Sequence, residues 1–263
     1  MNSEMDYALI TGASLGIGKE IAKELSRRKY NTLLVALDTP ELKELEHEIK
    51  DNYGTKVDSF GIDLTNPNAA QQIFYWCDDH DYTVSILINN AGFGEGGYFE
   101  NIPLERYCNM IDLNNKAYIS LIHKFLPGMK KLEFSHIMNT SSMEATLPLP
   151  YKAVYTGTKS FIYAYSLALN EEVRQFGMKV SILCPGGVTT TEEGLKRLKA
   201  QGAKGKLLNY MPDEVARNAV KNMLQGKLII NPGIINRLVV SILACIPLKL
   251  KMRLLGRIFS AYK

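Results

Sequence analysis

The 263-residue sequence has few of the residues that form disulfide bonds or bind metals. It contains four cysteines and four histidines, and none of them is in a CxxC or HxxxH spacing. Disulfide frameworks and zinc sites need such residues at close and regular intervals. The sequence therefore predicts neither kind of site, and it predicts that Cys184 and Cys245, which lie in apolar runs, fill the core.

Long hydrophobic runs are also lacking. The longest late run, Leu238–Ile246, is too short for a membrane-spanning helix, which takes about 20 residues. The opening segment Met1–Asp6 is polar, unlike a secretory signal peptide. The apolar share of 46% and the charged share of 22% are ordinary for a globular protein. We therefore expect a cytoplasmic protein whose length suits one α/β domain.

Acidic residues are absent from the last part of the chain. Residues 215–263 contain nine basic residues and no acidic one, whereas residues 1–214 contain 22 basic and 27 acidic residues. Basic charge without interleaved aromatic residues or a known motif does not predict nucleic-acid binding. The nine residues are Arg217, Lys221, Lys227, Arg237, Lys249, Lys251, Arg253, Arg257 and Lys263.

Two kinds of segment alternate along the chain. Short apolar runs predict strands at Tyr7–Ile10, Thr32–Leu37, Val57–Gly61, Ser85–Asn89, His136–Asn139, Val180–Leu183 and Leu228–Ile230. Helical spacing of apolar residues predicts helices at Gly18–Arg28, Glu41–Asn52, Asn68–Asp78, Leu104–Lys130, Ala153–Gln175 and Asp213–Gln225. This alternation implies crossover connections and one doubly wound parallel sheet of about seven strands, with helices on both faces.

A glycine-rich turn follows the first predicted strand. Gly12, Gly16 and Gly18 have the spacing GxxxGxG directly ahead of a predicted helix. Glycines let a backbone turn tightly beside a diphosphate, and the helix N-terminus offers free N–H groups and a favourable dipole. The turn is typical of a dinucleotide site, although glycines there also suit a tight connection without a ligand.

The end of the second predicted strand bears on the choice of dinucleotide. An acid there would bind the ribose hydroxyls of NAD, whereas a base would accept the extra phosphate of NADP. Asp38 follows the strand, and Leu15 and Leu37 occupy the positions where a base is expected. The sequence favours NAD over NADP. The competing interpretation makes Asp38 a helix N-cap before Pro40.

Tyr155 and Lys159 are one helical turn apart, so phenol and ammonium share a helix face. A nearby ammonium favours the phenolate and would lower the tyrosine pKa toward the working range. That suits a group that exchanges a proton with a carbonyl oxygen. By itself such a pair is more often part of a solvated helix face. Ser142, after the strand His136–Asn139, either donates to a substrate oxygen or lies in an ordinary turn.

Several motifs together resemble the short-chain dehydrogenase/reductase family in order and spacing, from about Asp6 to Thr190. The resemblance implies a Rossmann-type fold and NAD(P)-dependent interconversion of a carbonyl and a secondary alcohol. The motifs are Thr11–Gly18, Asn89–Gly92, Asn114, Ser142, Tyr155 with Lys159, and Pro185–Thr190.

The resemblance also implies roles for single residues. Tyr155 matches the general acid/base, and Lys159 matches the lysine that binds the nicotinamide ribose and lowers the tyrosine pKa. Ser142 matches the serine that positions the substrate oxygen, and Asn114 the asparagine that holds a helix bulge and a proton-relay water. The cofactor-binding residues, besides Tyr155 and Lys159, would be Gly12, Ser14, Leu15, Gly16, Ile17, Gly18, Asp38, Asp63, Leu64, Asn90, Ala91, Gly92, Pro185, Gly186, Val188 and Thr190.

The chain is expected to divide into a catalytic domain, residues 1–233, and a basic apolar extension, residues 234–263. The domain would include a substrate lid at residues 191–210. In a helix over Lys249–Ser260, basic residues would lie beside an apolar face made of Leu248, Met252, Leu255 and Phe259. Such a helix is typical of a membrane-surface anchor. The alternatives are packing over the substrate mouth and a dimer interface.

Two classes of function fit these features. The first is a dehydrogenase/reductase acting on an apolar small molecule, such as a long-chain ketone or a steroid. The second is a dinucleotide-binding redox sensor without chemistry. Because Asn114, Ser142, Tyr155 and Lys159 are all present, the sequence favours the enzyme. We also expect a homodimer or homotetramer built on the helices Leu104–Lys130 and Ala153–Gln175.

Overall fold

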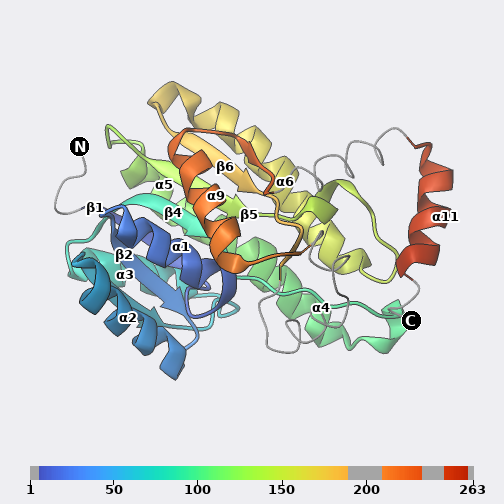
Figure 1. Ribbon diagram of the computed structural model, residues 1–263, viewed down its shortest axis with the longest axis horizontal. Helices are drawn as coiled ribbons and strands as arrows, with labels where there is room; N and C mark the ends of the chain where they lie inside the picture. Colours follow the sequence, from blue (N-terminus) through green and yellow to red (C-terminus); the bar gives the residue numbers. More distant parts are fainter. Residues whose placement is uncertain (1–5, 189–208, 233–245, 260–263) are drawn as a thin grey trace.

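A sheet of seven parallel strands forms the centre of the protein, as Figure 1 shows. The computed structural model describes residues 6–188, 209–232 and 246–259. The strand order is β3-β2-β1-β4-β5-β6-β9. The strands are β1 (Asp6–Thr11), β2 (Asn31–Ala36), β3 (Val57–Gly61), β4 (Thr83–Asn89), β5 (His136–Thr140), β6 (Lys179–Leu183) and β9 (Ile229–Ile230). All seven predicted strands are present, so the predicted sheet is confirmed.

Helices follow the strands as the sequence predicted, with one interruption. The predicted helix Leu104–Lys130 contains a π-helical turn, η2 (Asp112–Lys116), between α4 (Leu104–Ile111) and α5 (Ala117–Met129). The other long helices are α1 (Gly16–Arg27), α2 (Pro40–Tyr53), α3 (Ala69–Asp79), α6 (Ala153–Val173), α9 (Pro212–Leu224) and α11 (Leu248–Ile258). A second, two-stranded parallel sheet joins β7 (Gly187–Val188) to β8 (Asn209–Tyr210).

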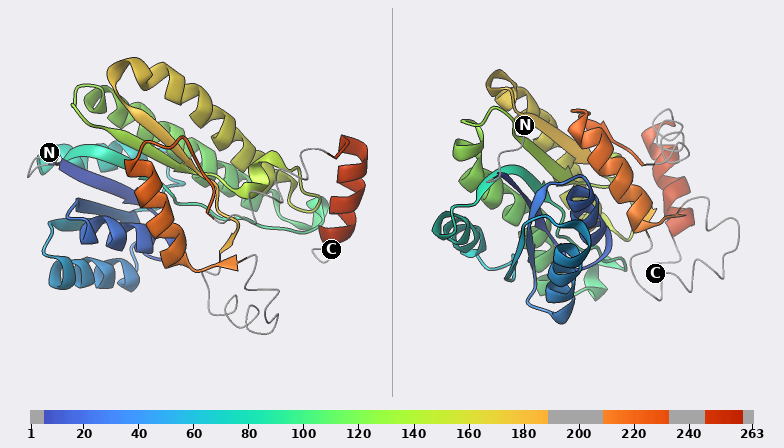
Figure 2. Two further views of the ribbon diagram at one scale, coloured as in Figure 1. Left: turned by 45° about the horizontal axis from the view of Figure 1, so that its top comes forward. Right: turned by 60° about the vertical axis from the view of Figure 1, so that its left-hand side comes forward.

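Alternate residues of the strands pack on opposite faces of the sheet. In β1, Ala8 and Ile10 join a buried cluster with α1, α2 and α9, whereas Leu9 joins another cluster with α3, α5 and α6. Successive side chains of a strand point to opposite faces, so a strand that is apolar throughout must be covered on both. Figure 2 shows the helices on the two sides of the sheet.

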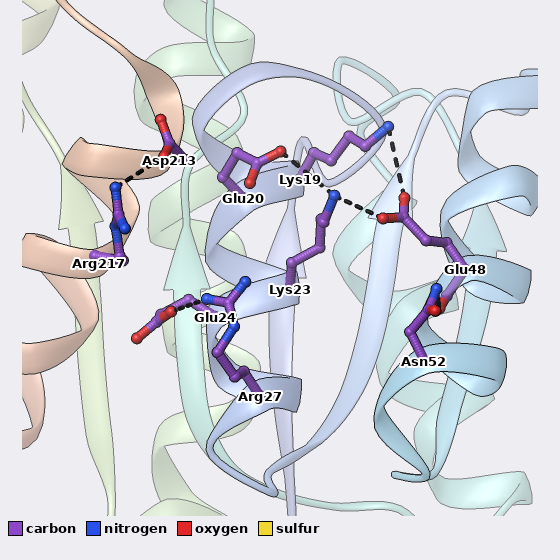
Figure 3. A network of polar contacts seen from close by, with 9 residues as sticks. All are labelled: Lys19, Glu20, Lys23, Glu24, Arg27, Glu48, Asn52, Asp213 and Arg217. Carbon is purple, nitrogen blue, oxygen red and sulfur yellow. Dashed lines mark hydrogen bonds and ion pairs between the residues drawn. The ribbon is translucent and has the colours of Figure 1, made fainter.

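The two helices beside the first strand are tied together by ion pairs, drawn in Figure 3. Lys23 of α1 lies 2.6 Å from Glu48 of α2, and Lys19 approaches the same carboxylate at 3.9 Å. At the end of α1, the carboxylate of Glu24 is buried and pairs with Arg28 at 2.7 Å. The pairs with Glu48 hold α2 against α1, whose N-terminus follows the glycine turn.

The C-terminal helix α11 packs against the loop between β5 and α6. Leu255 is buried against Leu147 and Leu149, and Phe259 packs on the same cluster. Leu248 was predicted to share this face, but it is 63% exposed because the helix meets the domain only through its second half. Figure 1 shows α11 at the end of the molecule opposite β1–β3. Within the described residues, no helix is long and apolar enough to cross a membrane.

Candidate active site

A cavity of about 450 Å³ opens at the carboxyl ends of the central strands. In the sheet, β1 lies next to β4. The chain continues from β1 toward β2 on one side and from β4 toward β5 on the other. Ligands of open α/β sheets bind at such a switch point. Thirteen of the residues that the sequence singled out line this cavity: Gly12, Ser14, Leu15, Gly16, Ile17, Asn90, Ala91, Gly92, Tyr155, Lys159, Pro185, Gly186 and Val188.

The glycine turn leaves room for a ligand close to its backbone. Gly12 and Gly16 have φ of 64° and 59°, a left-handed conformation that favours glycine. A Cβ on Gly18 would lie 2.1 Å from the carbonyl oxygen of Gly12, so this glycine lets α1 approach the turn. No side chain caps the N-terminus of α1, which leaves its first N–H groups for an anion. The turn therefore fits the diphosphate of a dinucleotide.

Thr11 joins the glycine turn to the end of β4. Its hydroxyl accepts hydrogen bonds from the backbone N–H of Asn90 at 2.9 Å and of Ala91 at 3.1 Å. The side-chain amide of Asn90 donates to the carbonyl oxygen of Thr11 at 3.2 Å. The two walls of the cavity are thus fixed to each other by residues at adjacent strand ends.

Several predicted cofactor residues lie outside the lining of this cavity. Asp38 is exposed, and the N-cap of α2 is Thr39, so the N-cap interpretation of Asp38 was wrong. Asp63 is exposed and accepts two hydrogen bonds from Thr65, whereas Leu64 is buried in the core. Thr190, with residues 191–208 of the predicted lid, lies outside the described residues. So do Leu238–Cys245 of the predicted apolar run.

Tyr155, Lys159 and Ser142 converge on the cavity from α6 and from the loop after β5. Tyr155 and Ser142 both line an adjoining cavity of about 340 Å³. The Ser142 hydroxyl accepts a hydrogen bond from the backbone N–H of Glu144 at 3.1 Å. The Lys159 amine is buried and donates to the carbonyl oxygen of Thr140 at 2.9 Å. Hydroxyl, phenol and amine therefore meet at the carboxyl end of the sheet.

Burial shifts the pKa values of the tyrosine and the lysine in opposite directions. It raises the pKa of Tyr155 to about 12, helped by the negative charge of Glu144 and opposed by a hydrogen bond with Ser142. It lowers the pKa of Lys159 to about 8. The expectation of a lowered tyrosine pKa was therefore wrong for this structure. Burial disfavours the charged form of both groups, and the carboxylate of Glu144 repels a phenolate at Tyr155.

Asn114 lies in the π-helical turn, behind the wall of the cavity and not in its lining. Its oxygen accepts from the backbone N–H of Phe93 at 3.1 Å, and its nitrogen donates to the Phe93 carbonyl at 2.9 Å. The same nitrogen donates to the Thr158 hydroxyl at 3.0 Å. Asn114 thus joins the loop after β4 to the helix that carries Tyr155. The predicted helix bulge at this residue is present as the π turn.

Sequence reasoning missed two charged residues at the substrate side. Glu144 and Lys152 line the adjoining cavity together with Ser142 and Tyr155. It also missed Gly94, where a Cβ would lie 2.7 Å from the Tyr155 ring. The signal for Glu144 was available, because it lies between two implied catalytic residues. Nothing in the sequence showed that the chain turns back to place it beside Tyr155.

Comparison with known proteins agrees with this geometry. The family model described as short chain dehydrogenase matches residues 6–201. A very-long-chain 3-oxoacyl-CoA reductase of Coprinopsis cinerea is 34% identical over 66% of this chain and 52% of its own length. The human protein of that name is 28% identical over 92% of this chain and 76% of its own. The chain spans about half the length of the fungal relatives that it matches.

Solved structures share the same architecture. A short-chain dehydrogenase from Sphingobium yanoikuyae in complex with NADPH has a TM-score of 0.77 and 26% identity, covering 92% of this chain and 97% of its own. A 7beta-hydroxysteroid dehydrogenase superposes with a TM-score of 0.88 at 22% identity, covering 95% of this chain and 96% of its own. The second likeness concerns the fold alone. With the family model matching most of its length, this chain belongs to the short-chain dehydrogenase family of oxidoreductases.

Proposed function

We propose that this protein interconverts a ketone and a secondary alcohol with NAD or NADP, using Tyr155 as the general acid/base. The observation that supports this most directly is the convergence of Tyr155, Ser142 and Lys159 beside a turn shaped for a diphosphate. A proton donor, a hydroxyl that can hold the substrate oxygen and a dinucleotide cradle are the parts that such a reaction needs.

Each residue has a part that follows from its position. The Ser142 hydroxyl donates to the substrate oxygen and orients it toward Tyr155. The Tyr155 hydroxyl gives its proton to that oxygen in the reducing direction and takes it back in the other. Lys159 would bind the ribose of the dinucleotide, and it supplies positive charge as phenolate forms. A bound nicotinamide supplies or accepts the hydride. Asn114 holds the loop and helix that set this geometry.

The choice between NAD and NADP remains a prediction. Leu15 and Leu37 are both exposed at the end of the sheet where a phosphate-binding base would be expected, and Asp38 lies beside them. These residues favour NAD. The Sphingobium structure contains NADPH, which favours the other dinucleotide. Measuring the Kd of both reduced cofactors by fluorescence titration decides the question; tenfold tighter NADPH binding would contradict the predicted preference.

An apolar substrate is supported by a cavity next to Ser142 and Tyr155. Four aromatic residues, among them Tyr98, Phe99 and Tyr107, line this cavity of about 260 Å³, which shares Glu95 and Lys152 with the cavity beside Tyr155. Apolar walls with a few polar groups suit a long-chain or polycyclic ketone. Because relatives are named very-long-chain 3-oxoacyl-CoA reductase, we propose a 3-oxoacyl thioester or a similar long-chain ketone, with steroids as the second class to test.

The test is a substrate panel read by nicotinamide absorbance, comparing long-chain 3-oxoacyl thioesters, short ones, steroids and sugars. We expect the long-chain ketones to give the highest kcat/KM. Tyr155→Phe should lower kcat by about 10² to 10⁴ without loss of cofactor binding, because the proton donor is removed. Tyr165→Phe, on the same helix, is the matched control. Near-full activity of Tyr155→Phe would contradict the proposal, and cofactor binding without any turnover would support the redox sensor.

The homo-oligomer remains a prediction, and exposed apolar side chains on two helices support it. Ile111 of α4 and Phe161 of α6 are 47% and 44% exposed. Large apolar side chains on neighbouring helices are typical of a subunit interface. We propose a homodimer or homotetramer through this surface. Sedimentation of the wild type should give an oligomer, and Phe161→Lys should shift it toward monomer; a monomeric wild type would contradict the proposal.

We further propose that α11 contacts an anionic membrane surface from the cytoplasmic side, in place of a contact between subunits. The apolar face predicted for this helix packs on the domain through Leu255 and Phe259, while a second stripe, Leu250, Leu254 and Ile258, is exposed. Lys249, Lys251 and Arg253 flank this stripe, and the described part of the chain offers them no ion pair. An apolar stripe with a basic border is complementary to anionic lipid.

Vesicle co-sedimentation tests this contact. The full chain should bind vesicles that contain anionic lipid, bind neutral vesicles weakly, and lose binding after Leu254→Glu. Leu104→Glu, an equally simple change at an exposed leucine of α4, should leave vesicle binding intact. Equal binding by wild type and Leu254→Glu, or a change of oligomeric state in Leu254→Glu, would contradict the membrane contact and favour a subunit interface.

A further inference from the structure

An acidic side chain lies beside the proposed proton donor, and no role has been given to it so far. Glu144 lines the cavity that also contains Ser142 and Tyr155. It is in the short helix η3 (Met143–Thr146), whose N-cap is Ser142. The backbone of Glu144 therefore holds the Ser142 hydroxyl through the 3.1 Å hydrogen bond, while its carboxylate faces the same site.

The carboxylate of Glu144 is held in a fixed position and is largely shielded from solvent. One carboxylate oxygen accepts a hydrogen bond from the Lys152 amine at 3.2 Å. The other, Oε2, is buried and has no hydrogen-bond partner among the described residues. The side chains of Glu144 and Lys152 are only 22% and 17% exposed. A charge in such a place acts on its neighbours more strongly than one in water.

The groups that face Tyr155 come from four elements. From η3 and its N-cap come Glu144 and Ser142, and from the start of α6 comes Lys152, whose amine is 5.8 Å from the centre of the Tyr155 ring. Lys159 lies one turn further along α6. Two residues complete the set: Tyr118 of α5, which interacts with Tyr155, and Glu95, which lines the same cavity and pairs with Arg106 at 3.0 Å. Both acids are ion-paired, and of the two it is Glu144 whose charge acts on Tyr155.

We propose that Glu144, held by Lys152, is a positioning residue that keeps the proton on the Tyr155 oxygen and thereby sets the upper pH limit of carbonyl reduction. This inference rests on the proposed function. In the reducing step the substrate carbon gains the hydride of the reduced nicotinamide, and the substrate oxygen gains the Tyr155 proton. The products are the alcohol, the oxidised nicotinamide and a phenolate, which recovers a proton from solvent.

The sign of the effect follows from the charge. A carboxylate beside the phenol disfavours phenolate, so the pKa of Tyr155 is raised and the phenol keeps its proton above neutral pH. Removing the carboxylate charge should let phenolate form at lower pH. Because oxidation needs the phenolate and the overall equilibrium of the reaction does not depend on the enzyme, the alkaline limit of reduction and the acid limit of oxidation must move together.

The decisive variant is Glu144→Gln, which keeps the shape of the side chain and removes its charge. The titration of Tyr155 is measured by ultraviolet absorbance of phenolate in the cofactor-free protein, as the difference between proteins with and without Tyr155→Phe. In Glu144→Gln the Tyr155 transition should lie roughly one pH unit below that of the wild type. At a fixed pH below the transition this corresponds to about tenfold more phenolate. The pH profiles of kcat/KM in both directions should shift downward by the same amount.

Two further variants separate this role from a structural one. Glu95→Gln removes an acid from the same cavity and should leave the titration of Tyr155 unchanged. Lys152→Gln removes the cation and should move the Tyr155 transition upward. Unshifted titration in Glu144→Gln, or an equal shift in Glu95→Gln, would overturn the proposal. Since the titration needs no substrate, this outcome is independent of the proposed reaction. If Glu144→Gln does not fold, Glu144→Ala takes its place, with the same downward shift expected.

Discussion

The strands on the two sides of the cavity are filled with different kinds of side chain. In β1 and β2, on the dinucleotide side, most of the buried residues are aliphatic, and the exceptions are Tyr7, Thr11 and Thr32. On the substrate side, β4, β5 and β6 contain buried polar side chains that bond across the sheet. Asn89 donates to Asn139 at 2.9 Å, and Asn139 donates to Ser166 of α6 at 2.9 Å. In the same sheet, His136 is bonded to Ser181 at 2.9 Å.

The difference shows two ways of placing functional groups. On the dinucleotide side, apolar packing holds a backbone turn. Its N–H groups are available to a ligand, and its glycines leave space for one. On the substrate side, side chains do the chemistry, and a bonded polar network connects β4, β5 and β6 to the helix that carries Tyr155. Buried hydrogen bonds specify one arrangement, but each becomes costly when a partner is lost.

The polar side should be the more sensitive to acid. Burial lowers the pKa of His136 to about 4, with a further contribution from the charge of Lys179. Unfolded His136 binds a proton near pH 6.5, so the unfolded state takes up more protons between about pH 6.5 and pH 4. Stability is fully present above this window and is lost as the pH falls through it, by about 3 kcal/mol in total. Urea unfolding across the window measures the loss.

A matched pair of histidine variants makes this measurement specific. His136→Gln should flatten the pH dependence of the unfolding free energy between about pH 6.5 and pH 4. His123→Gln replaces an exposed histidine of α5 and should leave that dependence unchanged. A steep loss of stability in acid that persists in His136→Gln would assign the effect to other groups.

The dinucleotide side should be the more sensitive to added volume. In Gly18→Ala the new methyl would meet the Gly12 carbonyl at 2.1 Å, so α1 must move away from the turn. We expect a loss of about 1–3 kcal/mol of stability and weaker binding of the reduced nicotinamide. Gly157→Ala is the control, because its Cβ would meet nothing within 4 Å; within a helix it should stabilise by about 0.5–1 kcal/mol. Equal destabilisation by both variants would contradict this account.

The smallest effect is expected for the ion pair between α1 and α2. Lys23→Met removes the 2.6 Å contact with Glu48 and should cost about 0.2–1 kcal/mol, less at high salt. Arg217→Met removes a pair with Asp213 inside the single helix α9, drawn in Figure 3, and should cost less. Thermal unfolding at two salt concentrations compares them. A Lys23→Met loss that is independent of salt would point to lost packing of the side chain.

The sequence predicted those parts of the molecule that depend on near neighbours. The seven strands, the glycine turn and the one-turn spacing of Tyr155 and Lys159 are all local patterns. What the predicted apolar face of α11 packs against could not be predicted in this way, because Leu255 meets Leu147, more than 100 residues earlier in the chain. The amphipathic pattern identified the face that contains Leu255 and Phe259, and the fold was needed to show that this face packs on the domain.

The same limit applies to ionisation. A lysine four residues from a tyrosine predicts a lowered tyrosine pKa only if the pair is treated alone. In the structure Lys159 is buried and Tyr155 half-buried, Lys159 donates to Thr140, and Glu144 brings negative charge from another element. Burial and the nearby acid outweigh the spacing. Residue types therefore predicted the chemistry of the site, and the fold was needed for its electrostatics.

The π-helical turn η2 gives the site a dependence on chain length as well as on residue identity. A π turn closes its hydrogen bonds five residues apart, so it amounts to one residue inserted into an α-helix. Deleting a single residue within 112–116 would join α4 and α5 into a continuous and regular helix. It would also rotate one part against the other by about 100° and remove Asn114 from Phe93 and Thr158. A deletion that improves the helix would thus disconnect the two walls of the site.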